Sequence, residues 1–156
     1  MKPFVTGLLM TALLGAAELA SQKALTLEVA KQMAALGEAE AIKNKWTVVV
    51  ALVDAGGHLI YLQKMDETQV GSSDLAPMKA KSAVFYKRPT KTFEENLVGG
   101  RQAILSLPNA IPVEGGLPVV VEGKVIGGIG VSGATSAQDG QVAQAILNGF
   151  AKILSK

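Results

Sequence analysis

Glycine is concentrated in the segment Gly115–Ala145, GGLPVVVEGKVIGGIGVSGATSAQDGQVAQA, and no other segment restricts the possible folds as strongly. Two β-branched runs, Val119–Glu122 and Val125–Val131, flank Gly123-Lys124, and this pattern predicts a β-hairpin. Glycine weakens a strand unless another group must approach its main chain closely. The glycines of the second run therefore predict close contact with another backbone or with a flat ligand.

The patterns in the rest of the sequence predict further helices and strands. Together they indicate an α+β domain whose strands pair as antiparallel hairpins, with helices packed on the faces of the sheet. The expected helices are Leu27–Lys45 capped by Thr26, Leu75–Lys87 with Pro77 in its first turn, a short helix with a Thr92/Glu95 capping box, Arg101–Leu107, and Ser136 to about Leu154. Besides the glycine-rich hairpin, the expected strands are Trp46–Asp54, His58–Met65 and an edge strand at Ile111–Val113.

Composition favours one domain, residues 18–156, and excludes several classes of protein. The sequence of 156 residues has no cysteine, which rules out disulfides and thiolate metal sites. The net charge of +2 and the few aromatic residues give no support to nucleic-acid binding. The hydrophobic content of 49% predicts extra apolar surface, which is most simply buried between subunits of a homo-oligomer.

Residues 1–17 predict a cleaved signal peptide. Lys2 precedes an apolar run, Phe4–Leu14, and small residues follow at Gly15-Ala16-Ala17. The run is too short for a transmembrane helix. An amphipathic or buried N-terminal helix is the alternative interpretation. If the peptide is cleaved after Ala17, the protein is periplasmic or secreted.

The loop after the glycine-rich hairpin is the first candidate ligand site. Its hydroxyl groups and successive main-chain N–H groups lie just before a helix, where anions are favoured. The candidate residues are Ser132, Gly133, Thr135, Ser136 and Asp139. The alternative is an ordinary N-cap, with Asp139 interacting with the helix dipole. The loop lacks the spacing of a nucleotide-binding P-loop.

A basic stretch provides the second candidate. Lysines at 79, 81, 87 and 91 and Arg88 suit the carboxylates or phosphates of a small ligand. Pro89 restricts the backbone of Arg88 and so directs its side chain. A solvated helix face explains the lysines equally well.

His58 is the only histidine, and it follows two glycines at a predicted turn. It is the first candidate axial ligand for haem iron or another metal, although a surface turn residue is the alternative. Tyr61, Tyr86 and Met65 are further candidate ligands whose alternative role is packing. No motif for covalent haem attachment and no Ser-His-acid set is present.

The glycine-rich segment resembles the signature of the GlcG/HbpS-like family, also called the haem-degrading domain family, which includes the C-terminal domain of PduO-type proteins. Two more blocks resemble the same family in the same order, VVVALVDAGGHLIYLQKMD (Val48–Asp66) and KAKSAVFYKRPTKTFEE (Lys79–Glu95). The resemblance extends from about Leu25 to the C-terminus. One departure is Gly140, where many relatives have a carboxylate, so no role of that acid is transferred.

The resemblance implies a profilin-like five-stranded antiparallel sheet and assembly into dimers or rings as large as octamers. It also implies haem or a related tetrapyrrole as ligand, and it identifies Arg88 and Thr90 of the Arg-Pro-Thr turn as site residues. Three hypotheses follow: an exported haem-binding protein with weak haem breakdown, a protein acting on a small hydroxy acid, aldehyde or diol, and a ligand-responsive module for a sensor. In the second, Arg88 binds a carboxylate and Asp139 or His58 moves a proton. The sequence leaves open whether the protein is an enzyme.

Overall fold

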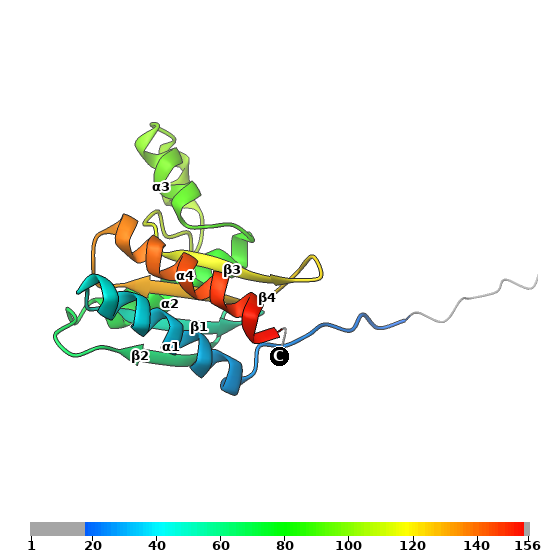
Figure 1. Ribbon diagram of the computed structural model, residues 1–156. Coiled ribbons are helices and arrows are strands. Elements are labelled where there is room, and N and C mark those ends of the chain that lie inside the picture. Colours follow the sequence, from blue (N-terminus) through cyan, green and yellow to red (C-terminus); the bar gives the residue numbers. More distant parts are fainter. Residues whose placement is uncertain (1–17, 155–156) are drawn as a thin grey trace, which may run out of the picture.

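A computed structural model describes residues 18–154, which form one sheet with helices on both faces (Figure 1). The signal-peptide prediction for residues 1–17 lies outside the described residues. The helices are α1 (Leu27–Asn44), α2 (Ser72–Tyr86), α3 (Lys91–Val98) and α4 (Ser136–Leu154), with a 3-10 helix, η1, at Gln102–Ser106. The strands are β1 (Val49–Asp54), β2 (Leu59–Lys64), β3 (Gly116–Val121) and β4 (Lys124–Ser132).

The sheet is antiparallel, with the strand order β2-β1-β4-β3. The α+β class and the antiparallel pairing are confirmed, but the expectation of five strands is wrong for the described residues. Ile111–Val113 forms no strand. Its first N–H donates to Ser82 Oγ at 3.0 Å, and Pro112 has no N–H to donate to a sheet.

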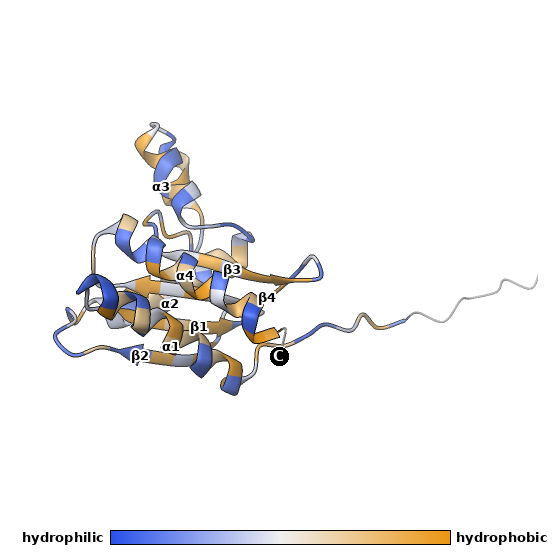
Figure 2. Ribbon diagram, in the orientation of Figure 1, coloured by the Kyte–Doolittle hydropathy of each residue, from blue (hydrophilic) through white to orange (hydrophobic). Residues whose placement is uncertain are grey.

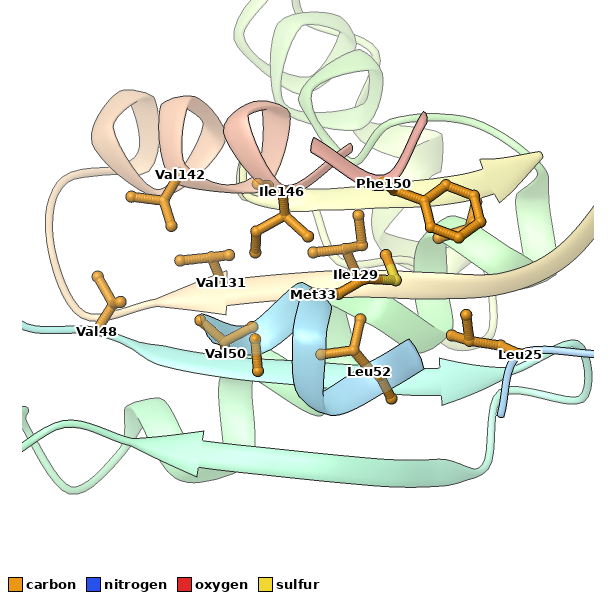
Figure 3. Close-up of a cluster of buried hydrophobic side chains, with 14 of the residues drawn as sticks. Leu25, Met33, Val48, Val50, Leu52, Ile129, Val131, Val142, Ile146 and Phe150 are labelled. Atoms are coloured by element: carbon orange, nitrogen blue, oxygen red, sulfur yellow. The ribbon is translucent and has the colours of Figure 1, made fainter. Parts of the chain in front are cut away.

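The main core lies between the sheet and the helix pair α1 and α4. Figure 3 shows Val142, Ile146 and Phe150 of α4 pointing toward strands β1 and β4. Met33 of α1 joins the same cluster and is fully buried. This spacing of three and four residues along α4 gives the apolar stripe that the sequence predicts. Helix α2 packs alone on the opposite face of the sheet, so the domain has three layers.

Several predicted boundaries shift for local reasons. Thr26 caps α1 as expected, since its Oγ1 accepts from Val29 N at 3.3 Å. Helix α2 begins three residues before the predicted start, which puts Pro77 in its second turn. The hairpin turn is Glu122-Gly123, and both residues have positive φ, as a two-residue hairpin turn requires. Among the described residues, no helix has the length and apolarity needed to cross a membrane.

Strand β2 contains a β-bulge, so its side chains do not alternate between the two faces of the sheet along its whole length. A bulge opposite Leu52 and Val53 puts Ile60 and Tyr61 against the same core cluster, while Leu62 contacts the α2 side. An extra residue in one strand of an antiparallel pair shifts the face of every residue beyond it. Composition alone does not reveal such a bulge.

Candidate functional site

The glycines of β4 allow helix α2 to approach the sheet. A Cβ added to Gly128 would lie 2.6 Å from the main-chain oxygen of Ala80, and one added to Gly130 would overlap the main-chain oxygen of Ala76. Helix α2 in turn places alanines against these glycines. The sequence predicted a close neighbour, and that neighbour is the backbone of α2 rather than a ligand.

Lys79 and Asp139 form an ion pair in the interior. Lys79 Nζ lies 2.9 Å from Asp139 Oδ2 and donates to Val131 O at 3.0 Å. Lys79 is fully buried, and Asp139 is 2% exposed. Burial raises the pKa of the Asp139 carboxyl above its ordinary value, although Lys79 and the N–H of Ala134 favour the ionised form. The structure therefore brings two predicted site residues together as a structural pair with almost no exposed surface.

Thr90 and Ser132 are also interior residues. Thr90 Oγ1 accepts from Gly116 N at 2.9 Å, and Thr90 N donates to Gly116 O at 3.0 Å. Ser132 Oγ donates to Ser72 Oγ at 3.1 Å. Both predicted site residues thus attach neighbouring segments to the sheet. Thr90 precedes α3 without a side-chain cap, so the capping box predicted at Thr92 and Glu95 is wrong.

The loop before α4 satisfies its own main-chain donors. Thr135 and Gln138 form a capping box, because Thr135 Oγ1 accepts from Gln138 N and Gln138 Oε1 accepts from Thr135 N. Asp139 Oδ1 accepts from Ala134 N at 3.0 Å. Gly133 turns the chain with a φ of +151°, and Ser136 begins α4. The arrangement supports the N-cap interpretation, since side chains of the protein occupy the donors expected to attract an anion.

Arg88 is exposed beside an aromatic pair. Its Nε donates to Tyr86 O at 3.1 Å, and its guanidinium carbon lies 5.9 Å from the centre of the Phe93 ring. Tyr86 packs edge-on against Phe93 and donates its hydroxyl hydrogen to Pro108 O. Tyr86 is therefore occupied by structural contacts, while the Arg88 guanidinium keeps exposed donors.

The β1–β2 turn presents His58 to solvent. Its side chain is 83% exposed, and Nδ1 lies 3.3 Å from the Asp54 carboxylate. Because a carboxylate only accepts hydrogen bonds, this contact places the imidazole hydrogen on Nδ1 and leaves the Nε2 lone pair free. Hydrogen bonds from the main-chain N–H of His58, and also of Gly56, hold the pKa of Asp54 below its ordinary value.

An exposed aromatic side chain and a half-buried lysine of α2 lie beside this turn. A Cβ added to Gly57 would lie 2.8 Å from the Phe85 ring and 2.9 Å from Lys81 Cγ. Lys81 Nζ stands 5.1 Å from the centre of the Phe85 ring. Leu59 follows His58 in sequence and is 54% exposed. These three residues lie on the α2 side of the turn. The His58 ring instead contacts Asp54, which pairs with Gly127 on the Leu25 side of the sheet. We call the four residues around this turn, His58, Leu59, Lys81 and Phe85, the histidine face.

Two hollows elsewhere on the surface provide weaker candidates. One of about 380 Å³ lies beside the start of α4, and the Lys91–Glu114 ion pair at 3.2 Å is part of its wall. Another of about 660 Å³ lies between α1 and α4 and contains none of the predicted site residues. Within residues 18–154, no group of three His, Asp or Glu side chains is arranged to hold a metal ion.

Tyr61 and Met65 are partly buried against the main core cluster. The sequence analysis missed Leu59 and Phe85. Phe85 could be found from helical periodicity, because it lies four residues after Lys81 on the outer side of α2. Leu59 could be found only as the neighbour of His58 at an exposed turn. Neither signal separates a ligand surface from an ordinary exposed side chain.

The chain has relatives in both sequence and fold. The chain belongs to the HbpS-like family, whose model, described as "Haem degrading protein HbpS-like", matches residues 25–148. It is 43% identical over 108 residues to Protein GlcG of Escherichia coli (strain K12). This match covers 69% of this chain and 81% of GlcG.

Two solved structures share the fold and a substantial part of the sequence. The crystal structure of HbpS is 32% identical, with a TM-score of 0.77, and the match covers 86% of this chain and 98% of HbpS. A crystal structure described as a PduOC:heme complex is 28% identical, with a TM-score of 0.73, and the match covers 81% of this chain and 94% of that one.

Proposed function

We propose that this protein is an exported, oligomeric haem- or tetrapyrrole-binding protein that holds its ligand on the histidine face. The observation that carries the proposal is His58, the only imidazole in the chain, which is exposed with a free Nε2. A histidine ligand to a metal characteristically donates its other ring N–H to a carboxylate, as Nδ1 does here to Asp54. Membership of the HbpS-like family and the likeness to the PduOC:heme complex support the same ligand.

The residues around His58 fit a flat, dianionic macrocycle. The Phe85 ring and the Leu59 side chain offer apolar contact, and both are about half-exposed. The Lys81 ammonium group provides a cation for a propionate. Bound haem would supply an iron centre for redox or oxygen chemistry, and Asp54 would hold the imidazole in the orientation and tautomer that iron ligation requires. Haem breakdown, export after cleavage at Ala17 and the oligomeric state are further parts of this proposal.

Titration with hemin, followed by the Soret band, tests the ligand. We expect a saturable Soret shift for the wild-type protein, and we expect His58→Ala to abolish or move it, because the iron loses its nitrogen ligand. Gln32→Ala, at an exposed polar side chain of α1, serves as the control and should keep the wild-type spectrum. Absorbance that rises without saturation would exclude haem as a specific ligand, and an unchanged His58→Ala spectrum would exclude ligation by His58.

The alternative in which Asp139 moves a proton on a small hydroxy acid has less support. Asp139 is buried and paired with Lys79, so a substrate has almost no access to its carboxylate. Loss of hemin binding with retained binding of a small hydroxy acid would favour that alternative.

A further inference from the structure

One end of the main core opens into an apolar hollow of about 330 Å³. Figure 3 shows Leu25 and Phe150 together at this end of the core. Figure 2 shows the hydrophobic last turn of α4, which lies close to the extended segment that precedes α1. Apolar walls come from that segment, from α1, from the β3–β4 hairpin and from the end of α4, namely Leu25, Val29, Val121, Ile126, Phe150 and Leu154.

The hollow has the size and the lining of a site for a small, largely apolar molecule. Ligand pockets are mostly apolar concavities of about 300 to 1,000 Å³, with a few polar groups that fix the orientation of the ligand. Ile126 and Phe150 are buried in its floor, whereas Leu154 is 57% exposed at its rim. At about 30 Å³ for a group the size of a water molecule, the hollow has room for roughly ten non-hydrogen atoms.

The charge at the hollow is positive. Among the described residues that line it, Lys23 is the only charged one. Lys23 Nζ lies 2.6 Å from Glu122 Oε1 in the hairpin turn, and the two side chains are 61% and 71% exposed. An ion pair this exposed contributes little, so Lys23 can exchange Glu122 for the anion of a ligand at small cost. The carboxylate of Glu28, on the exposed side of α1, accepts a hydrogen bond from Gln32.

The segment before α1 covers one side of the hollow. We call residues 21–25 the N-terminal strap. Lys124 Nζ donates to Ser21 O at 2.7 Å, a bond between exposed groups, whereas Leu25 is buried in the main core. The strap is therefore anchored at Leu25, and its upstream residues can move aside for an entering ligand without opening the core.

We propose that this hollow binds an amphipathic carboxylate with an alkyl chain of about ten carbons. The chain lies against Ile126 and Phe150, and the carboxylate accepts hydrogen bonds from Lys23 Nζ in place of Glu122. The head group stays at the exposed mouth, which avoids the cost of burying an anion. The hollow shares no residue with the histidine face, so this site goes beyond the proposed function and does not depend on it.

Isothermal titration calorimetry of the full chain with decanoate, below the concentration at which decanoate forms micelles, tests the site. We expect saturable binding of one decanoate per chain. From hexanoate to decanoate, each added methylene group should strengthen binding about fourfold, because it leaves water for the apolar hollow. The absence of saturable binding would overturn the proposal, as would an affinity that does not depend on chain length.

A variant that fills the hollow tests its position. Ala24 is exposed and lines the hollow, so Ala24→Phe places a ring there and should weaken decanoate binding at least tenfold. Ala20→Phe is the matched control, since Ala20 is exposed in the same segment and does not line the hollow, and it should bind decanoate as the wild type does. Unchanged binding by Ala24→Phe, or equal weakening by both variants, would overturn the placement of the ligand.

The head group tests the role of Lys23. Lys23→Gln should weaken decanoate binding about threefold, the scale of an exposed charge pair. Decyltrimethylammonium, with the same chain and a cationic head, should bind the wild type about tenfold more weakly than decanoate, because attraction to Lys23 is replaced by repulsion. Lys31→Gln, at an exposed lysine of α1, is the control and should keep the wild-type affinity. Equal binding of the two probes by the wild type would exclude a carboxylate as the class of ligand.

His58→Ala separates this site from the proposed haem site. We expect the variant to bind decanoate as the wild type does, and loss of that binding would overturn the separate site. A protein that binds decanoate but not hemin removes the proposed function alone. A protein that binds hemin but not decanoate removes this inference alone.

Discussion

Helix α2 carries two lysines, two residues apart, in opposite environments. Lys79 is fully buried against Asp139 and Val131 O, whereas Lys81 reaches over the exposed ring of Phe85. The residue type and the local sequence are nearly the same, and only the position around the helix differs. The inner lysine connects α2 to the start of α4, and the outer lysine remains available to a ligand.

The same division separates most of the predicted site residues. Thr90, Ser132 and Asp139 lie in the interior with Lys79, and each is occupied by a contact that holds the fold. Arg88 and His58 lie on the surface. More of the conspicuous polar residues named here are interior structural contacts than surface side chains open to a ligand, and substitutions can separate the two classes.

The largest expected effect is at the inner lysine. Lys79→Met leaves the Asp139 carboxylate buried without its counterion, and breaking a buried pair in this way costs about 3–5 kcal/mol of the free energy of unfolding. Chemical denaturation monitored by circular dichroism measures it. Lys81→Met is the matched substitution on the outer side and should change stability by less than about 0.5 kcal/mol.

A double variant sharpens this result. Replacing both partners, with Lys79→Met and Asp139→Leu, removes the unpaired charge and should recover most of the lost stability. If Lys79→Met alone lowers the free energy of unfolding no more than Lys81→Met does, the inner lysine is not structural and its assignment to the interior is wrong.

The next largest effect concerns the glycines under α2. Gly130→Ala places a methyl group against the main-chain oxygen of Ala76, so one of the two backbones must shift. Overpacking of this kind lowers the free energy of unfolding by about 3 kcal/mol. Gly71→Ala is the control, since a Cβ there meets nothing within 4 Å, and φ is −62°. Thermal or chemical denaturation of both variants makes the comparison, and similar stabilities would contradict the close packing of α2 on β4.

Much of the fold could be predicted because the relevant signals are local. Thr26 before an apolar helical pattern predicts the start of α1, and the β-branched runs around Gly123 predict the β3–β4 hairpin. The glycines of β4 predicted a close neighbour correctly. The order of helices and strands and the antiparallel pairing follow from these local patterns.

The rest depends on contacts between residues distant in the sequence. The Ile111–Val113 segment resembles an edge strand, but Ile111 bonds to Ser82 instead of a neighbouring strand. The β-bulge opposite Leu52 and Val53 and the pairing of Lys79 with Asp139, sixty residues away, also leave no local signal. The histidine face joins residues from two segments, so only the folded chain places Phe85 beside the His58 turn.

The smallest expected effect is at Asp54, whose partly exposed carboxylate contrasts with the buried one of Asp139. Main-chain N–H bonds lower the pKa of Asp54 in the folded state, so its ionised form stabilises the protein at pH values above the ordinary aspartate pKa of 3.8. This contribution is lost as the pH falls through the lowered pKa. The side chain is 44% exposed, so solvent screening keeps the contribution below about 1 kcal/mol. Urea denaturation of Asp54→Asn at pH 7, 5 and 3 should show a deficit against the wild type that is smaller at pH 3 than at pH 7. Asp66→Asn, at another exposed carboxylate, should stay within about 0.5 kcal/mol of the wild type at each pH. A deficit of Asp54→Asn that is as large at pH 3 as at pH 7 would mean that the carboxylate charge is not what stabilises the histidine turn.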